Sequence, residues 1–565
     1  MRSVIGKSVA LASLGLLALA LAGCTSGAKL RRAEVGERTA EGDLDKTFSI
    51  SVDPRMELLG VVQHFTSWAP GGHIKSETAY KSDIDDYFGE FRNHRAVACV
   101  ESLVAAGFTH DAPVRFMLHH HDPPEFVQHT PYSEYLVNRA GGEEILTELA
   151  DALRDFARQT NFMAFYRSHA PLYDIHMAEV EALLSEKDYV QALEDFFGES
   201  AIGYHVILPP LFAGGYGPAI RREKGWDLYA VIGPCALRGE RVTFACLGYL
   251  ESIMLHEWSH SFVNPLVDQN YDLFSKSEGL YDPIRGMMTS QAYPTWRIAL
   301  YEHVVRASEI NIRATLYDGF DKNVSLQVQE GKGFWYVSYI DSLLDLYQIH
   351  REDYPTFAEF MPLIAAGLGE LSVDELPERI TAFAGPLSGV FPRARCIYLV
   401  RPTAVDEELV GGIGGELEGF THFLASFQME SHIVSDTEAL DMNWEDKVAF
   451  VYGNTDNNVF LRQLRIGIPL GFRSNAIEFG GQRYEGEGMV LISCMPNPFN
   501  KMLPFVVCVT NRSEDLIGIG MRVSSPSEWD ADYVLYGGAE RLAVGRYHKE
   551  KGTWTLPESE PELRQ

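Results

Sequence analysis

The residues His256-Glu257-Trp258-Ser259-His260 constrain the fold of this chain more than any other stretch. Residues four apart on an α-helix lie on one face, one turn above the other, so two imidazoles at this spacing can hold one metal ion. The preceding run 249–255 has helical character, and Pro265 is expected to stop the helix. The motif therefore predicts a helix on which His256 and His260 bind Zn²⁺ while Glu257 acts as general base on a water molecule. The alternative is a partly buried helix with two ordinary histidines.

A catalytic zinc site needs a third protein ligand and one open position. No glycine and third histidine follow His260 at close range, so the third ligand must come from a remote part of the chain. Glu302 is the preferred candidate, because it belongs to an otherwise apolar helical stripe where a carboxylate is costly unless it is paired or bound to metal. An exposed pair between Glu302 and Arg306 is the alternative. The rival ligands are His303 and Glu309.

The plan of two histidines and a glutamate on a following helix resembles the gluzincin clan of thermolysin-like zinc metallopeptidases. More closely, the segments 255–265, 292–293 and 301–307 are similar to an uncharacterised bacterial lipoprotein family of exported, gluzincin-like zinc metallopeptidases that is catalogued as a domain of unknown function. The segments 87–97 and 208–217 resemble the N-terminal part of the same family. This resemblance covers roughly residues 55 to 380. It implies a zincin-like metallopeptidase fold with His256, His260 and Glu302 as zinc ligands and Glu257 as the base.

One position departs from the thermolysin-like pattern, and two further expectations concern the substrate. The pattern has an aspartate four residues after the ligand glutamate, where it orients a zinc histidine. Here that position is Arg306, which cannot accept a hydrogen bond, so another group must orient the imidazole. Tyr293 is the expected donor to the oxyanion, with His205 as second choice. An edge strand at 242–245 or 204–208 is expected to pair with an extended peptide.

The start of the chain has the features of an export signal. The apolar run Val9–Ala22 follows basic residues and is too short to span a membrane. It closes with Leu21-Ala22-Gly23-Cys24, which resembles the lipobox of bacterial lipoprotein signals. The resemblance implies a signal peptide over 1–23, a lipid on Cys24, and a polar tether over 24–45. The expected location is the bacterial cell envelope, with membrane attachment through Cys24; an ordinary secretory signal is the alternative.

Composition and texture define the expected domains and partners. The net charge of −30 repels phosphate backbones and no basic cluster offsets it, so nucleic acid is not an expected partner. Residues 46–388 mix helices and strands, which predicts an α+β domain, and the resemblance implies that this domain is a zincin-like metallopeptidase. Residues 389–550 contain short apolar runs between Gly, Asn and Pro, which predicts a C-terminal α/β or β-rich domain of unknown role.

Local patterns predict several single elements. A strand is expected at 61–65 and a helix at 83–100. His119-His120-His121 is expected to lie in a surface loop before two prolines. Gly411-Gly412-Ile413-Gly414 begins like a dinucleotide loop but lacks its third glycine. The cysteines beyond Cys24 show no Cys-x-x-Cys spacing, and their pairing cannot be deduced.

Together these features predict a lipid-anchored, exported zinc metallopeptidase that acts on a peptide or protein. Two alternatives stay open. The chain could be a surface binding lipoprotein with an inert zincin fold, although such a protein has no need of the base Glu257. It could also be a zinc hydrolase of a non-peptide amide such as a cell-wall bond, because the same chemistry serves both substrates.

Overall fold

The computed structural model describes residues 46–556 except 75, 247, 377, 426–428, 465–469, 474–475, 520–522, 524–525 and 551–552. The predicted signal peptide, the tether and Cys24 lie outside the described residues. The described chain forms two compact units: an N-terminal unit of residues 46–326 and 336–372, and a C-terminal unit of residues 327–335 and 373–556. The main boundary between the two units falls after Ser372, whereas the predicted domain boundary lies after residue 388. No helix among the described residues is both long and apolar enough to cross a membrane.

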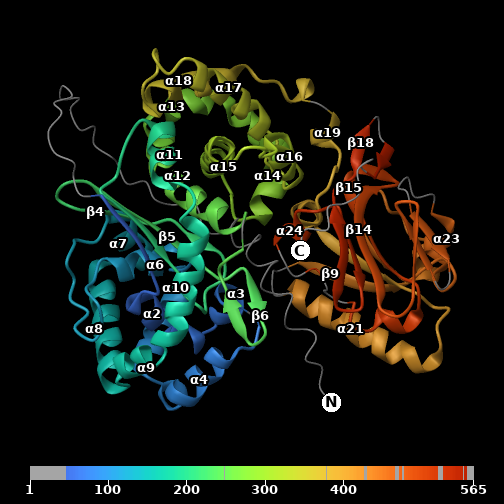
Figure 1. The fold of residues 1–565 in the computed structure, drawn as a ribbon, viewed down its shortest axis with the longest axis horizontal. Coiled ribbons are helices and arrows are strands. Elements are labelled where there is room, and N and C mark those ends of the chain that lie inside the picture. Colours follow the sequence, from blue (N-terminus) through green and yellow to red (C-terminus); the bar gives the residue numbers. More distant parts are fainter. Residues whose placement is uncertain are drawn as a thin grey trace. The chain divides into compact units, whose positions relative to one another are not determined.

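The N-terminal unit is built on one mixed sheet (Figure 1). Strands β1 (Thr47–Ser51), β2 (Gly203–Ile207) and β5 (Trp226–Ile232) are parallel. The short strands β3 (Gly215–Tyr216) and β4 (Ala219–Arg221) pair antiparallel with β5. The connection from β1 to β2 is helical and contains α2 (Pro54–His64), α3 (Ala69–Gly72), α4 (Ala79–Phe88), α5 (Arg95–Ala105), α6 (Asp111–Leu118), α7 (Glu134–Ala140), α8 (Glu143–Gln159), α9 (Phe162–Ser168), α10 (Ala170–Leu184) and α11 (Tyr189–Phe197).

Two predictions in this helical region were wrong. The expected strand at 61–65 overlaps the second half of helix α2 and its C-terminal cap. Asp53 caps the start of this helix, because its side chain accepts the N–H of Arg55 at 2.8 Å. Residues 56–63 of α2 are all buried, so the run lacks the exposed face that reveals a helix in a sequence. The expected helix at 83–100 is two helices, α4 and α5, because the turn at 89–94 separates them and His94 caps the second.

The helices after the sheet carry the zinc motif. A hairpin of β6 (Ala236–Arg238) and β7 (Arg241–Thr243) lies between Cys235 and Cys246, which form a disulfide. The helices that follow are α12 (Leu250–Gln269), α13 (Tyr271–Phe274), α14 (Tyr281–Ser290), α15 (Trp296–Leu316), α17 (Val337–Ile349) and α18 (Phe357–Glu370). Pro265 lies inside α12 and does not end it, because the next turn remains buried through Leu266 and Val267. Thr295 caps α15 by accepting the N–H of Ile298.

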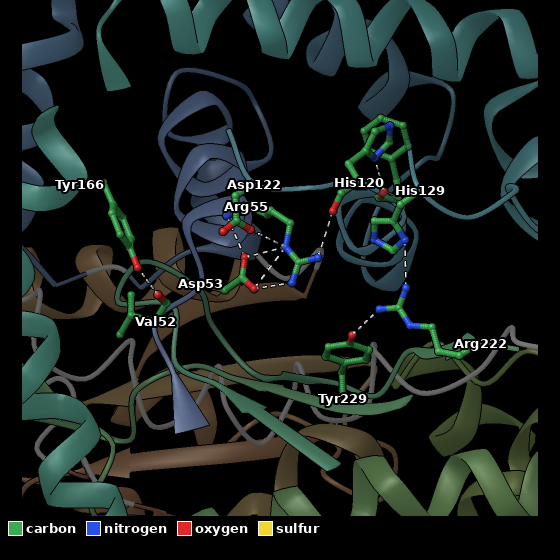
Figure 2. A network of polar contacts seen from close by, with 10 residues as sticks. Val52, Asp53, Arg55, His120, Asp122, His129, Tyr166, Arg222 and Tyr229 are labelled. Atoms are coloured by element: carbon green, nitrogen blue, oxygen red, sulfur yellow. Dashed lines mark hydrogen bonds and ion pairs between the residues drawn. The ribbon is translucent and has the colours of Figure 1, made fainter. Parts of the chain in front are cut away.

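Polar side chains gather over the face of the sheet that is turned away from α12 (Figure 2). Arg55 binds the carboxylate of Asp53 at 2.6 Å and the carbonyl of His120 at 3.1 Å. Arg222 bridges the Nδ1 of His129 at 2.9 Å and the hydroxyl of Tyr229 at 3.3 Å. A pocket of about 800 Å³ lies between the two arginines and the loop 120–129. Arg55 is paired with Asp53 and Arg222 with Asp227, so both guanidinium groups are held in place. Through its contacts with His120 and His129, this network holds the loop to the sheet.

The histidines before this loop do not lie on the surface, contrary to the prediction. His119 caps the C-terminus of α6 and is buried, and His120 is fully buried with its ring stacked on Phe126 at 4.2 Å. Only the third residue of the run, His121, is exposed. The reason is that every residue of α6 is buried, so the chain leaves this helix inside the unit.

Glu57 is a buried carboxyl group within α2. The hydroxyl of Tyr80 donates to it, and the hydroxyl of Tyr173 lies 2.7 Å from that of Tyr80. Burial raises the pKa of Glu57 to about 8, against the effect of these hydrogen bonds. In the unfolded chain the group ionises near pH 4.5. The stability that its neutral form contributes is therefore complete below pH 4.5 and is lost as the pH rises toward 8.

The C-terminal unit contains a seven-stranded mixed sheet of order β17-β16-β14-β15-β10-β8-β9. Its strands are β8 (Cys396–Arg401), β9 (Glu430–Ser435), β10 (Val448–Tyr452), β14 (Met489–Asn497), β15 (Asn500–Thr510), β16 (Tyr533–Gly537) and β17 (Glu540–Gly545). Strands β15, β10, β8 and β9 are parallel, and the others are antiparallel. The expected β-rich character is confirmed. Gly411–Gly414 lie within α21 (Glu407–Ala425), which connects β8 to β9, so they form no phosphate loop.

The segment 327–335 belongs to this unit although it precedes α17 in the chain. It buries the aromatic rings of Phe334 and Trp335. The Lys332 ammonium lies 2.8 Å from the carboxylate of Asp530, and the Arg393 guanidinium lies 6.0 Å from the centre of the Trp335 ring. The chain therefore enters the C-terminal unit, returns to the N-terminal unit, and enters again after Ser372.

Candidate metal centre

Helix α12 carries the two motif histidines on one buried face. Their Nε2 atoms lie 3.1 Å apart. Trp258 packs on the ring of Tyr204 in β2, so the side of α12 that carries Trp258 faces the sheet. Residues two apart on a helix point to nearly opposite sides, which turns His256 and His260 away from the sheet. On that side α12 packs along α15 (Figure 1).

Glu302 of α15 completes the group. It is fully buried, its Oε1 lies 3.3 Å from the Nε2 of His260, and its Oε2 lies 3.6 Å from the Nε2 of His256. One ligand atom from each of the three residues lies within 4.8 Å of the other two. In a tetrahedral zinc site, bonds of about 2.0–2.2 Å place nitrogen and oxygen ligands about 3.3–3.6 Å apart. The three side chains therefore have the donor types and the spacing of a zinc site with one position left for another ligand.

The two rival ligands have other partners. His303 binds the carbonyl of Ala299 through Nδ1 at 2.7 Å, and its ring lies beside Tyr336. Glu309 pairs with Arg313 at 3.1 Å. Neither belongs to the group of possible metal ligands that the described residues form around His256.

Asn264 supplies the orienting contact that the sequence analysis left open. Its Oδ1 lies 3.1 Å from the Nδ1 of His260, one helical turn away. An amide oxygen accepts here, so Nδ1 of the ring donates and Nε2 keeps its lone pair for the ligand group. Partners of this kind fix the tautomer and the direction of metal-binding histidines.

Arg306 takes up the position where the thermolysin-like pattern has an acid. Its Nη2 donates to the Oε2 of Glu302 at 2.9 Å. The alternative pairing of these two residues therefore exists, but it is buried and coexists with the contacts between Glu302 and the histidines. Tyr293 is buried and hydrogen-bonds with Arg306, so it lies beside the ligand group and is linked to it through the guanidinium.

His205 is not brought to this group. Its Nδ1 lies 2.7 Å from the Oγ of Ser49, its Nε2 lies 3.6 Å from Asp227, and its ring stacks on Tyr229. These partners belong to the face of the sheet turned away from α12. Tyr204 points toward α12, and successive residues of a strand point to opposite faces.

The charges of the centre decide which groups remain ionised. Burial lowers the pKa of His256 well below its usual range, which favours the neutral imidazole. Burial alone would raise the pKa of Glu302, but Arg306 and the two imidazoles outweigh it and hold that pKa well below its usual range. Burial alone would lower the pKa of His260, but its hydrogen bond with Glu302 and the charge of that carboxylate raise it. A metal ion binds such groups as neutral imidazole and ionised carboxylate.

Glu257 lies next to the ligand group in a cradle made by glycines. Both its carboxylate oxygens are buried and have no hydrogen-bond partner among the described residues. A Cβ atom on Gly215 would lie 2.8 Å from Oε1, and one on Gly217 would lie 2.8 Å from Oε2 and 2.4 Å from the carbonyl oxygen of Glu257. Only glycine lets the segment lie this close. Burial raises the pKa of Glu257 to about 7.

The sequence pointed to this segment, with its run Ala-Gly-Gly-Tyr-Gly at 213–217, only through the family resemblance, and its place beside Glu257 was not predicted. Of the two predicted edge strands, 204–208 was wrong as an edge, because it overlaps β2, which pairs with both β1 and β5. Residues 242–245 overlap β7, which pairs with β6 in a separate two-stranded sheet and is an edge strand there; its pairing with a peptide stays a prediction. The strand at the end of the sheet beside Glu257 is β3, which contains Gly215.

No curated protein and no solved structure shows a significant match to the chain. One family model matches, and its description is Domain of unknown function (DUF4932). The matched residues are 48–366, which include most of β1, the His256–His260 motif and the helix of Glu302. Since this match covers more than half of the 565 residues, the chain belongs to the DUF4932 family.

Proposed function

We propose that the chain is a zinc metallopeptidase of gluzincin type. The observation that carries this proposal is the convergence of His256, His260 and Glu302 within 4.8 Å, with the unpartnered carboxylate of Glu257 beside them. Two imidazole lone pairs 3.1 Å apart repel each other unless a proton or a cation lies between them. The donor set of two nitrogens and one carboxylate is that of catalytic zinc sites in thermolysin and carboxypeptidase A.

The ligand group favours zinc over the common alternatives. Imidazole nitrogen is a poor ligand for Mg²⁺ and Ca²⁺, which take oxygen ligands. The centre lacks a thiolate, and its three ligands leave a position open, which is the arrangement of catalytic rather than structural zinc sites. A bound zinc ion would supply a Lewis acid and lower the pKa of a water molecule.

In the proposed reaction Glu257 accepts a proton from the attacking water and returns it to the leaving amine nitrogen. Both oxygens of this carboxylate are buried and have no hydrogen-bond partner among the described residues, so they are available to take up and return that proton. Arg306 keeps Glu302 ionised and fixed, and Asn264 keeps the ring of His260 in one tautomer. Tyr293 remains our candidate for a second donor to the oxyanion, which requires its hydroxyl to turn from Arg306 to the substrate.

The substrate we propose is an extended peptide. Strand β3 lies at one end of the sheet and passes directly over Glu257. A peptide that adds to such an edge forms main-chain hydrogen bonds along its length, which would place a scissile carbonyl beside the carboxylate. Attachment to the cell envelope through Cys24 is part of this proposal and rests on the lipobox-like residues 21–24.

Three matched glutamate variants test the proposed function. We expect Glu257→Gln to keep its zinc and lose hydrolysis, and Glu302→Gln to lose zinc. Glu309→Gln alters a buried glutamate of the same helix outside the ligand group, and we expect it to keep both properties. Zinc is measured by elemental analysis and hydrolysis on casein and quenched peptide libraries. Full zinc content in Glu302→Gln, or undiminished hydrolysis in Glu257→Gln, would refute the proposal. Cleavage of peptidoglycan fragments alone would support the non-peptide amide alternative.

A further inference from the structure

A second group of metal-binding side chains lies in the C-terminal unit, outside the residues that match the family. Cys396 begins β8, and Glu430 and His432 lie on β9. One ligand atom from each lies within 4.8 Å of the other two. We propose that Cys396, Glu430 and His432 form a second binding site for a divalent transition-metal ion, and this inference is independent of the proposed peptidase function.

The strand register brings these residues together. Strands β8 and β9 are parallel, with Cys396 opposite Glu430 and Tyr398 opposite His432. Residues two apart on a strand share a face, so the thiol, the carboxyl and the imidazole all project from the same side of the sheet. The Nε2 of His432 already lies 3.0 Å from the Oε1 of Glu430. Tetrahedral zinc sites place nitrogen and oxygen ligands about 3.3–3.6 Å apart, and the three ligand atoms here lie within 4.8 Å of one another.

The donor set selects the kind of ion. Thiolate and imidazole favour zinc and neighbouring transition metals over Mg²⁺ and Ca²⁺, which prefer oxygen ligands. The site is open to solvent, since the side chains of Glu430 and His432 are 69% and 48% exposed. Because β9 is the last strand of its sheet, its outer edge is not occupied by another described strand. We therefore expect an exchangeable ion with water in the remaining position.

One cation stands near the site. The Lys447 ammonium lies 5.9 Å from the centre of the Tyr398 ring. The hydroxyl of Tyr398 contacts the thiol of Cys396. Lys447 is paired with Asp446 at 2.6 Å, so its charge is partly compensated. An exposed ion pair between His432 and Glu430 alone would be worth little. The thiol of Cys396 adds a soft sulfur ligand to the pair of His432 and Glu430, and this ligand favours a transition-metal ion.

Cobalt titration separates this site from the one in the N-terminal unit, because only the second site has a sulfur ligand. The full chain with Cys24→Ser is freed of metal and titrated with Co²⁺. We expect about two cobalt ions per chain and a near-ultraviolet charge-transfer band from thiolate to cobalt. Cys396→Ser should lose the band and one ion. His256→Ala should lose the other ion and keep the band.

Two controls make the result decisive. Cys99→Ser removes another partly exposed free thiol and should leave the band unchanged. His432→Ala, an exposed substitution that leaves the fold intact by circular dichroism, should lose the band at equimolar cobalt. A wild-type chain without the band, a band that survives in Cys396→Ser, or a band lost in Cys99→Ser would each overturn the proposal. None of these results bears on the peptidase variants.

Discussion

The contact between Gly217 and Glu257 makes the sharpest prediction about the proposed active site. A methyl group at position 217 would lie 2.4 Å from the carbonyl oxygen and 2.8 Å from the Oε2 of Glu257. The Oε2 contact can be relieved by rotating the side chain, but the carbonyl is part of α12. Real Cβ contacts essentially never fall below 3.0 Å, so Gly217→Ala must separate the segment from the helix by about 0.6 Å.

The size of the effect follows from overpacking. Forcing a methyl group into a packed site costs about 1–3 kcal/mol. The smaller entropy of an unfolded chain with alanine offsets about 0.4–1 kcal/mol of this. We expect a net loss of about 1–2 kcal/mol, which lowers the melting temperature by about 2–8 °C at about 2–4 °C per kcal/mol. Displacement of the base should lower kcat/KM about 10- to 100-fold, since a misplacement of about 1 Å can cost about 100-fold.

The assay compares Gly217→Ala with Gly286→Ala by calorimetry, zinc content and peptide hydrolysis. Gly286 lies within α14, and a Cβ atom there meets no atom within 4 Å. Alanine in a helix is more favourable than glycine by about 0.5–1 kcal/mol, so this control should be neutral or stabilising. Both variants should keep their zinc. A Gly217→Ala protein with wild-type melting temperature and hydrolysis would show that the segment does not press on the motif helix.

Three further predictions concern buried polar groups. Glu57→Gln should make the free energy of unfolding less dependent on pH, because in the wild type it falls by up to about 1.4 kcal/mol per pH unit between pH 4.5 and 8. Urea titrations at several pH values measure this, and equal pH dependence in both proteins would contradict the prediction. Asn264→Ala should weaken zinc binding about 10- to 100-fold in chelator competition, and unchanged affinity would remove its role in orienting His260. Arg306→Gln should cost the metal-free protein about 3–5 kcal/mol, since Glu302 keeps a buried charge, and zinc should restore most of it; equal losses with and without zinc would refute this.

The helix of the zinc motif and the helix of Glu302 could be predicted because their signals are local. Four-residue spacing, the Thr295 cap and a lone carboxylate in an apolar stripe are all readable in the sequence. The prediction of a strand at 61–65 was wrong because a helix that is buried on every side has no periodic pattern of apolar residues in its sequence. Asn264 is four residues from His260, but the sequence predicted only a helix end at the neighbouring Pro265, and helix propensity does not reveal a side-chain contact.

The glycine cradle could not be predicted from the sequence. Gly215 and Gly217 lie about forty residues before Glu257, and their meaning depends on how β3 pairs with β5 and packs on α12. Contacts of that kind are set by tertiary structure and leave no local spacing to recognise. The same holds for Arg306, whose role follows from the burial of Glu302 and not from the residue type alone.

The chain contributes two separate segments to the C-terminal unit, and this affects how the residues that match the family can be studied as a fragment. A fragment ending at residue 366 would include Phe334 and Trp335 without Arg393 and Asp530, the partners of their segment. It would present a loop of apolar side chains with nothing to cover them and would be prone to self-association. The residues that match the family are therefore not the same as the compact unit of the structure, and a shortened protein should have this loop replaced by a polar linker.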